Sequence, residues 1–348
     1  MSGDYTTITD PSAYFHTQLY TGSGSSGLQV RNNANAGDFT PDWLWIKPRS
    51  IADNHVLFDS SRGFNKQLKS NGNDAEDTHS PARITRETNG FDVDTTDQNY
   101  NQSSATYVAW QWIANGGTTS TNSDGTVDVT IQVNSTAGFS IMKWNGNGNT
   151  SGTVGHGLGA VPDMILNKYG LDGTSNWGVA FPKFETSKLL MLNGTGGFTS
   201  ASGMSSYNSS TFVDGNGAST GGTIAYCFKN VKGYSRFGFY VGNGNTDGPS
   251  VYTGFKPAFL MIKRSDGSGY WVMLDSKRNL PNGTGQRLGA QANDAEYGST
   301  NIDFLSNGFK VRASNSDSDT NLDGGTYVYM AFADKPYVTP DGVIATAV

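Results

Sequence analysis

The stretch that decides the fold is Pro41-Asp-Trp-Leu-Trp-Ile-Lys47, a proline followed by a largely apolar run that ends in a lysine. The pattern returns as Pro162-Asp-Met-Ile-Leu-Asn-Lys168 and as Pro257-Ala-Phe-Leu-Met-Ile-Lys263. Short apolar runs with aromatic and β-branched residues are typical of strands, and proline is tolerated at a strand's first residue. The sequence therefore predicts three equivalent strands.

The motifs around each of these runs also occur three times, in the same order. An aromatic residue followed by x-Gly-x-Gly precedes each run, at Tyr20, Trp144 and Tyr240. An aromatic-rich stretch closes each copy: Tyr107-Val-Ala-Trp-Gln-Trp112, Thr223-Ile-Ala-Tyr-Cys-Phe228 and Tyr327-Val-Tyr-Met-Ala-Phe332. Ordered blocks at matching spacings predict an internal triplication.

Copies one and three share further motifs that the middle copy lacks. Asp59-Ser-Ser-Arg62 matches Asp275-Ser-Lys-Arg278, and Asn73-Asp-Ala-Glu76 recurs as Asn293-Asp-Ala-Glu296. The Asp and Arg of the first motif are predicted to form structural ion pairs near strand ends. The middle copy is therefore the divergent one.

The fold class that follows is all-β, with three tandem β-sandwich or jelly-roll-like repeats of about 95–110 residues each. Gly and Asn, which border the predicted strands, suit the tight turns between antiparallel strands. The predicted organisation is an N-terminal arm (1–13), repeat 1 (14–114), a Gly/Ser/Thr linker with an extra strand (115–137), repeat 2 (138–232), repeat 3 (233–335) and a C-terminal arm (336–348). Each arm is expected either to reach a neighbouring molecule or to be a loose terminus.

Composition excludes several classes of function. The 348 residues carry a net charge of −6, which argues against binding nucleic acid through its phosphates. No apolar run approaches the roughly 20 residues of a membrane-spanning helix, so no membrane insertion is expected. The single cysteine, Cys227, forbids an intrachain disulfide and a multi-cysteine metal site, and is expected to be a small buried residue.

Two groups of carboxylates are candidates for chemistry. Asp74 with Glu76, and Asp294 with Glu296, could supply the two opposed acids that glycoside hydrolysis requires. Their recurrence at one repeat position favours a turn or packing motif instead, so the sequence predicts no catalytic residues and no enzyme.

A second acidic stretch offers oxygen ligands at alternate positions, as calcium loops do. These are Asp317, Asp319, Asn321 and Asp323. The spacing does not match an EF-hand, so no cofactor is predicted, and a structural calcium ion is the alternative to a solvated hairpin loop.

Seven tryptophans admit two interpretations. Trp43 and Trp45 lie two residues apart, which places their side chains on one face of a strand, and such faces would form an aromatic core where two sheets meet. Alternatively, exposed rings could stack on sugars or contact a partner protein. The residues expected to do so are Trp45, Trp112 and Trp271.

The chain resembles a repeated domain of unknown function found in structural proteins of marine and cyanobacterial bacteriophage virions. The resemblance rests on Asp10-Pro-Ser-Ala-Tyr-Phe15, on the three motifs of copy one that contain Tyr20, Trp43 and Trp110, and on Phe58-Asp-Ser-Ser-Arg-Gly63. Copy three matches through its equivalent motifs, whereas the middle copy departs from the pattern.

The resemblance implies a non-enzymatic virion structural protein, made in the host cytoplasm and placed on the particle exterior. We expect a capsid decoration or cement protein that bridges subunits of the major capsid protein or other virion proteins, with a homo-oligomer possible. The absence of a heptad stem or collagen-like run favours this over a tail fibre. The alternatives are a tail-fibre or spike head that binds host-surface glycan and, second, a glycan-degrading enzyme.

Overall fold

The structure, a computed structural model, describes residues 6–32, 39–146, 151–200, 203–215, 221–278, 282, 286–298 and 301–336. Its regular secondary structure consists almost entirely of antiparallel strands, which confirms the all-β prediction. The helical elements among these residues are the short η1 (Pro11–Ala13) and α1 (Gln98–Asn101). None of the helices in this part of the chain is long and apolar enough to cross a membrane.

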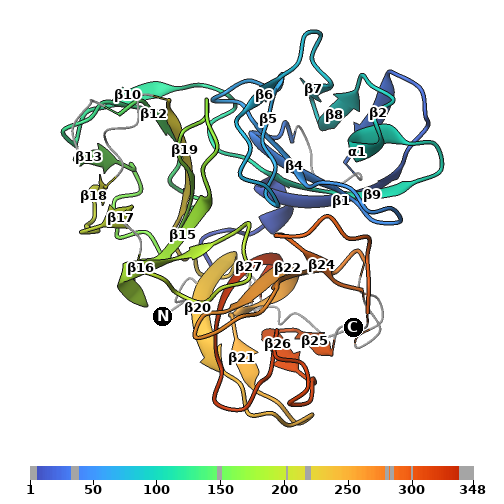
Figure 1. The fold of residues 1–348 in the computed structure, drawn as a ribbon, viewed down its shortest axis with the longest axis vertical. Helices are drawn as coiled ribbons and strands as arrows, with labels where there is room; N and C mark the ends of the chain where they lie inside the picture. The colour runs from blue at the N-terminus through green and yellow to red at the C-terminus, as the bar shows by residue number, and fades with distance from the viewer. Residues whose placement is uncertain are drawn as a thin grey trace.

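The strands form three units: unit 1 (residues 15–112), unit 2 (residues 120–228) and unit 3 (residues 235–336). Unit 1 contains a four-stranded and a three-stranded sheet, with a separate strand pair (Figure 1). The large sheet has the order β1 (Phe15–Thr21), β9 (Thr106–Trp112), β3 (Trp43–Pro48), β4 (Val56–Asp59). The small sheet has the order β2 (Leu28–Arg31), β8 (Gly90–Val93), β7 (Ile84–Glu87). The pair is β5 (Lys66–Gln67) with β6 (Asp77–Thr78).

Unit 2 repeats this plan with extra strands at both edges of its large sheet. That sheet has the order β10 (Ser120–Asn122), β11 (Val129–Asn134), β12 (Phe139–Trp144), β19 (Thr223–Phe228), β14 (Met164–Lys168), β15 (Trp177–Phe181), β16 (Glu185–Met191). The small sheet has the order β13 (Gly152–Gly155), β18 (Thr211–Asp214), β17 (Met204–Ser205).

Unit 3 has a five-stranded and a three-stranded sheet. The large sheet has the order β20 (Ser235–Val241), β27 (Thr326–Pro336), β22 (Phe255–Arg264), β23 (Trp271–Asp275), β24 (Leu288–Gly289). The small sheet has the order β21 (Ser250–Tyr252), β26 (Gly308–Val311), β25 (Ile302–Leu305).

The three units thus share one strand order. In each large sheet the opening strand (β1, β12, β20) pairs with the closing strand (β9, β19, β27), which pairs with the Pro-led strand (β3, β14, β22). The pairing register aligns Tyr20 opposite Tyr107, Trp144 opposite Thr223 and Tyr240 opposite Tyr327. Positions in the three units can therefore be compared one by one.

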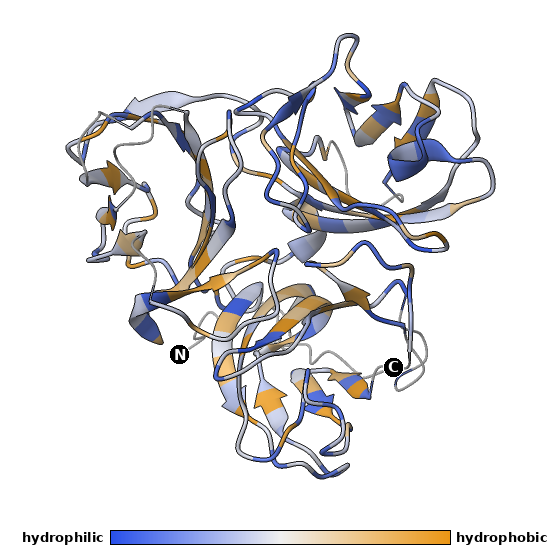
Figure 2. Ribbon diagram, viewed as in Figure 1, coloured by the Kyte–Doolittle hydropathy of each residue, from blue (hydrophilic) through white to orange (hydrophobic). Residues whose placement is uncertain are grey.

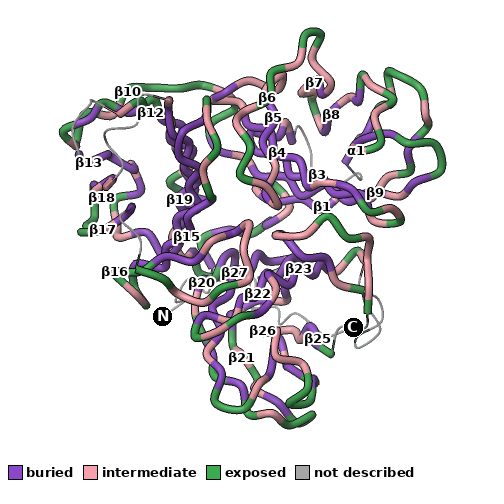
Figure 3. Tube along the Cα trace, in the orientation of Figure 1, coloured by how far each residue is buried: buried purple, intermediate pink, exposed green. Residues whose placement is uncertain are grey.

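Each unit is a two-layered sandwich with its own apolar core between the large and the small sheet. In unit 1 this core joins Leu44 and Ile46 of β3 to Phe91 of β8. The small sheets lie on the outside of the molecule, and buried residues concentrate along the large sheets (Figures 1 and 3). Apolar residues follow the same large-sheet strands (Figure 2).

A fourth core fills the centre, where the other faces of the three large sheets meet. It contains Trp43 and Trp112 of unit 1, Tyr226 of unit 2 and Phe259 and Phe332 of unit 3, all with at most 1% of their surface exposed. The rings of Trp43 and Tyr226 stack with centroids 4.4 Å apart. Because both faces of each large sheet are covered, strands such as β3 are buried along their whole length.

The predicted terminal arms lie only partly within the described residues. Residues 1–5 and 337–348 lie outside them. Of the N-terminal arm, Ile8 belongs to the central core, and the Thr6 hydroxyl donates a hydrogen bond to the Lys232 carbonyl at 3.0 Å. This part of the arm therefore packs on its own chain.

Candidate functional site

The tryptophans expected to contact glycan or a partner are covered in the structure. Trp45, Trp112 and Trp271 each expose 1% of their surface. The expectation that they form an outer contact surface is wrong, because their rings lie in the central core between units. The core interpretation of Trp43 and Trp45 holds, with the difference that this core is shared by three sandwiches.

Aromatic ring nitrogens at one equivalent position link each unit to the next. The Nε1 of Trp177 in unit 2 donates to the Lys69 carbonyl of unit 1 at 2.8 Å. The Nε1 of Trp271 in unit 3 donates to the Met191 carbonyl of unit 2 at 2.9 Å. Unit 1 carries His55 at this position.

His55 completes the cycle of units. Its Nε2 lies 3.0 Å from the Gly289 carbonyl of unit 3, and its Nδ1 accepts a hydrogen bond from Trp45 Nε1 at 2.8 Å. Because Nδ1 is an acceptor, the ring proton sits on Nε2 and is donated to Gly289. Burial, with a smaller effect of the Lys47 charge, lowers the pKa of His55 well below its usual value. The neutral imidazole of His55 therefore supplies the third contact, and the three units are joined in a closed cycle.

The lysines that end the three Pro-led runs lie at the same junctions. Lys168 Nζ of unit 2 donates to the Asn73 carbonyl of unit 1 at 3.1 Å, and Lys263 Nζ of unit 3 donates to the Thr195 carbonyl of unit 2 at 3.0 Å. Lys47 Nζ donates to the Pro48 carbonyl. Burial lowers the pKa of each lysine to about 8. The recurrence of a lysine at this one position was the sequence signal that could have predicted this role.

The predicted Asp–Arg ion pair of unit 1 is present and wholly buried. Arg62 Nε lies 2.5 Å from Asp59 Oδ2, and Arg62 Nη1 lies 3.1 Å from Glu76. The Tyr226 hydroxyl of unit 2 donates to the same Asp59 oxygen at 2.8 Å. The cluster thus binds unit 2 to unit 1.

Unit 3 carries the matching cluster. Arg278 Nε lies 2.5 Å from Asp275 Oδ2 and its Nη1 lies 2.9 Å from Glu296. Trp110 Nε1 of unit 1 donates to Asp275 Oδ2 at 3.1 Å, and Arg49 of unit 1 lies 2.7 Å from Glu296. This cluster binds unit 1 to unit 3.

The divergent middle copy replaces this cluster with aromatic rings. Phe181 and Phe184 stand where the other units have the Asp and the Arg, and Phe198 stands at the position of Glu76. The rings of Phe184 and Phe198 lie 5.8 Å apart, and Phe184 also packs on Phe239 of unit 3 at 4.6 Å. Two junctions are therefore polar and the third is apolar.

The carboxylate pairs considered for glycan hydrolysis do not act as pairs. Asp74 and Asp294 are exposed, whereas Glu76 is held by Arg62 and Glu296 by two arginines. Burial alone would raise the pKa of Glu296, but the hydrogen bonds and charges of the arginines lower it. An ionised carboxylate of this kind stabilises a junction and is a poor general acid.

Three of the four candidate calcium ligands, Asp317, Asp319 and Asn321, contact other protein groups through their side chains. Asp317 and Asp319 each lie 3.4 Å from Arg287 Nη1, and Asp319 Oδ1 accepts from the Tyr270 amide at 2.8 Å. Asn321 is fully buried, with its amide donating to main-chain carbonyls, and Asp323 is exposed. Within the described ranges, His, Cys, Asp and Glu residues nowhere gather in a group of three that could hold a metal. Cys227 is buried, as expected.

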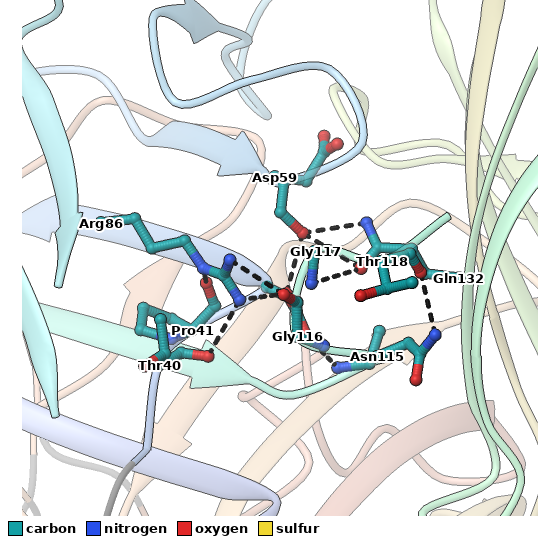
Figure 4. A network of polar contacts seen from close by, with 12 residues as sticks. Thr40, Pro41, Asp59, Arg86, Asn115, Gly116, Gly117, Thr118 and Gln132 are labelled. Atoms are coloured by element: carbon teal, nitrogen blue, oxygen red, sulfur yellow. Dashed lines mark hydrogen bonds and ion pairs between the residues drawn. The ribbon is translucent and has the colours of Figure 1, made fainter. Parts of the chain in front are cut away.

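Asp42, at the head of β3, fixes the point where the chain leaves unit 1. Its carboxylate accepts hydrogen bonds from the amides of Ala114 and Gly116, both at 2.8 Å, and lies 2.5 Å from Arg86 Nη2. Arg86 also reaches the carbonyls of Thr40, Pro41 and Gly116 (Figure 4).

Gln132 of β11 extends this polar network toward unit 2. Its Oε1 accepts from the Gly117 amide at 3.0 Å, beside the Arg86 contacts (Figure 4), and its Nε2 donates to Ser60 and Ser61 of unit 1. The network therefore holds the predicted linker and the extra strands β10 and β11 against unit 1.

The equivalent exit from unit 2 is held in the same way. Asp163 accepts from the Asn230 amide at 2.8 Å and lies 3.0 Å from Lys183 Nζ. Unit 3 has Ala258 at this position. The aspartate is thus present at the exits from units 1 and 2.

A family model described as a domain of unknown function (DUF7483) matches residues 10–336. The chain belongs to this family. The matched residues run from the N-terminal segment to the end of β27, so the family domain comprises all three units and their junctions. No curated protein matches the sequence.

Proposed function

We propose that this DUF7483 protein is a non-enzymatic structural protein of a bacteriophage virion, and that it decorates the capsid exterior. The observation that carries the proposal is the closed cycle of junctions. Buried charged and aromatic side chains join three similar sandwiches in this cycle, as in the Tyr226–Asp59 and Trp110–Asp275 contacts.

A body of this kind suits binding to a shell of repeated subunits. Three similar small sheets face outward around the shared central core (Figure 1). Each could contact a different capsid subunit, and the contacts would reinforce one another through their effective concentration. The resemblance of the motifs around Tyr20, Trp43 and Trp110 to phage virion proteins supports the same assignment. The protein would be made in the host cytoplasm before assembly.

The test is to raise antibodies against the purified protein and to use them on purified virus particles of its source. Labelling over the capsid surface is the expected result, followed by a low-resolution map with density of this shape outside the shell. Labelling confined to the tail, or no particle-associated protein, would overturn the capsid assignment.

One observation favours the alternative of a glycan-binding tail head. Phe239 and Tyr252 expose 55% and 66% of their surface, and exposed aromatic rings can stack on sugars. A glycan array with the intact protein and its Tyr252→Ala variant separates the two functions. Sugar binding that this change abolishes, with the fold unaltered, would support the tail-head function.

A further inference from the structure

The opening strand β20 is an outer edge of the unit 3 sheet. It pairs with β27 on one side, and within the described residues no strand pairs with its other side. The equivalent strand of unit 2, β12, is covered at the same edge by β11, with Lys143 opposite Thr130. The fold therefore accepts an antiparallel strand at this edge, and the same edge of β20 is unpaired within the described residues.

The open edge of β20 is also apolar. Phe239 and Val241 lie on one face of the strand and expose 55% and 51% of their surface. Phe184, exposed by 37%, packs against Phe239. Among the described residues these are three of the four large hydrophobic side chains that are exposed, and two of them, Phe239 and Val241, lie on β20 itself. Unpaired apolar edges are sites of strand pairing with another chain.

The hydrogen-bonding groups of β20 define how long the free edge is. In an antiparallel pair, alternate residues direct their main-chain groups toward the partner strand. The Phe237 amide points outward, because it donates to the Asn230 side chain at 2.7 Å. The Gly242 amide points inward and donates to the Gly325 carbonyl at 2.8 Å. By this alternation, Phe239 and Val241 direct their amides and carbonyls to the outside.

We propose that β20 pairs antiparallel with β20 of a second copy of this chain, about a two-fold axis at Tyr240. In this register Phe239 of one copy lies opposite Val241 of the other, and the four outward residues exchange four main-chain hydrogen bonds. Gly238 falls opposite Gly242 and Arg236 opposite Gly244, so these two flanking pairs bring together neither two large side chains nor two like charges. The short free edge matches this self-complementary pairing, which joins two large sheets into one.

The register predicts one cross-link. Replacing both Phe239 and Val241 by cysteine places the two thiols of facing strands opposite each other, and oxidation is expected to give a covalent dimer on a non-reducing gel. The native Cys227 is fully buried and takes no part. A matched pair at the outer edge of unit 1, Leu19→Cys with Thr21→Cys, is expected to stay monomeric.

The association itself is measured by sedimentation velocity over a range of protein concentrations. The wild-type protein is expected to dimerise. Phe239→Pro is expected to raise the dissociation constant at least about tenfold, because proline removes an outward amide, whereas the hydrogen bonds between β20 and β27 remain. Tyr252→Ser, which removes an equally exposed ring elsewhere, is the control and should leave the dimer intact.

A wild-type protein that stays monomeric at about 100 μM, or a dimer that Phe239→Pro leaves unchanged while circular dichroism shows the variant folded, overturns the proposal. Equal loss of the dimer in Tyr252→Ser would also overturn it. Because the measurement uses the isolated protein, its outcome is independent of where the protein sits on a virion.

Discussion

Removing the hydroxyl of Tyr226 tests whether the buried junctions stabilise the molecule. In the structure this hydroxyl, in unit 2, donates a hydrogen bond to the Asp59 carboxylate of unit 1 at 2.8 Å. Tyr226→Phe removes one oxygen atom and leaves the ring stacked on Trp43. Asp59 keeps its contacts with Arg62, so the change isolates the link between units.

The expected cost of Tyr226→Phe is about 2 kcal/mol, because hydrogen bonds to charged groups contribute about 1.5–3 kcal/mol. Tyr20→Phe is the matched control. Its hydroxyl donates to the neutral carbonyl of Tyr100 within one unit, at 2.9 Å, so its loss should cost about 1 kcal/mol.

The assay is urea unfolding, monitored by circular dichroism, of both single variants and of a double-mutant cycle that combines Tyr226→Phe with Asp59→Asn. We expect a coupling energy of at least about 1 kcal/mol between these two positions. The reasoning is refuted if Tyr226→Phe costs no more than Tyr20→Phe, or if the coupling is below about 0.5 kcal/mol.

Three further predictions concern the other junctions. Phe184→Arg should destabilise the protein by about 1–3 kcal/mol, and adding Phe198→Glu should recover about 1 kcal/mol, measured as urea midpoints; no recovery would show that the ion pair cannot replace the rings. The depressed pKa of His55 means that the unfolded chain binds the proton first, so stability should fall as the pH drops below about 6.5, and a flat Tm between pH 7 and 5 would contradict this. Lys263, with a folded pKa of about 8 against about 10.4 unfolded, should make stability rise from pH 8 to 10, a rise that Lys263→Met should reduce.

The sequence predicted the strands well because their signals are local. The runs that follow Pro41, Pro162 and Pro257 form β3, β14 and β22 of the large sheets, and the aromatic closing stretches form β9, β19 and β27. Turn residues and apolar runs fix such elements within a few residues. The Asp–Arg ion pairs were likewise predictable from spacing alone.

The central core was not predicted, because alternation places side chains on one face without saying what covers that face. Trp43 and Trp45 share a face, as expected, but Leu44 and Ile46 on the other face are equally buried. An apolar run without alternation is typical of a strand covered on both sides. The contact of Tyr226 with Asp59 joins residues far apart in sequence, and single-sequence patterns carry no information on such pairs.

The closed cycle of junctions has a consequence for biosynthesis. Unit 1 emerges first, yet His55 and Arg49 find their partners only at Gly289 and Glu296 of unit 3. At a translation rate of about 5–20 residues per second, the tryptophan-rich face of the first sandwich waits for its last neighbour on the order of tens of seconds. In a nascent chain stalled before residue 289, the part of this aromatic face that unit 3 covers would still be exposed, and quality-control factors should engage it there.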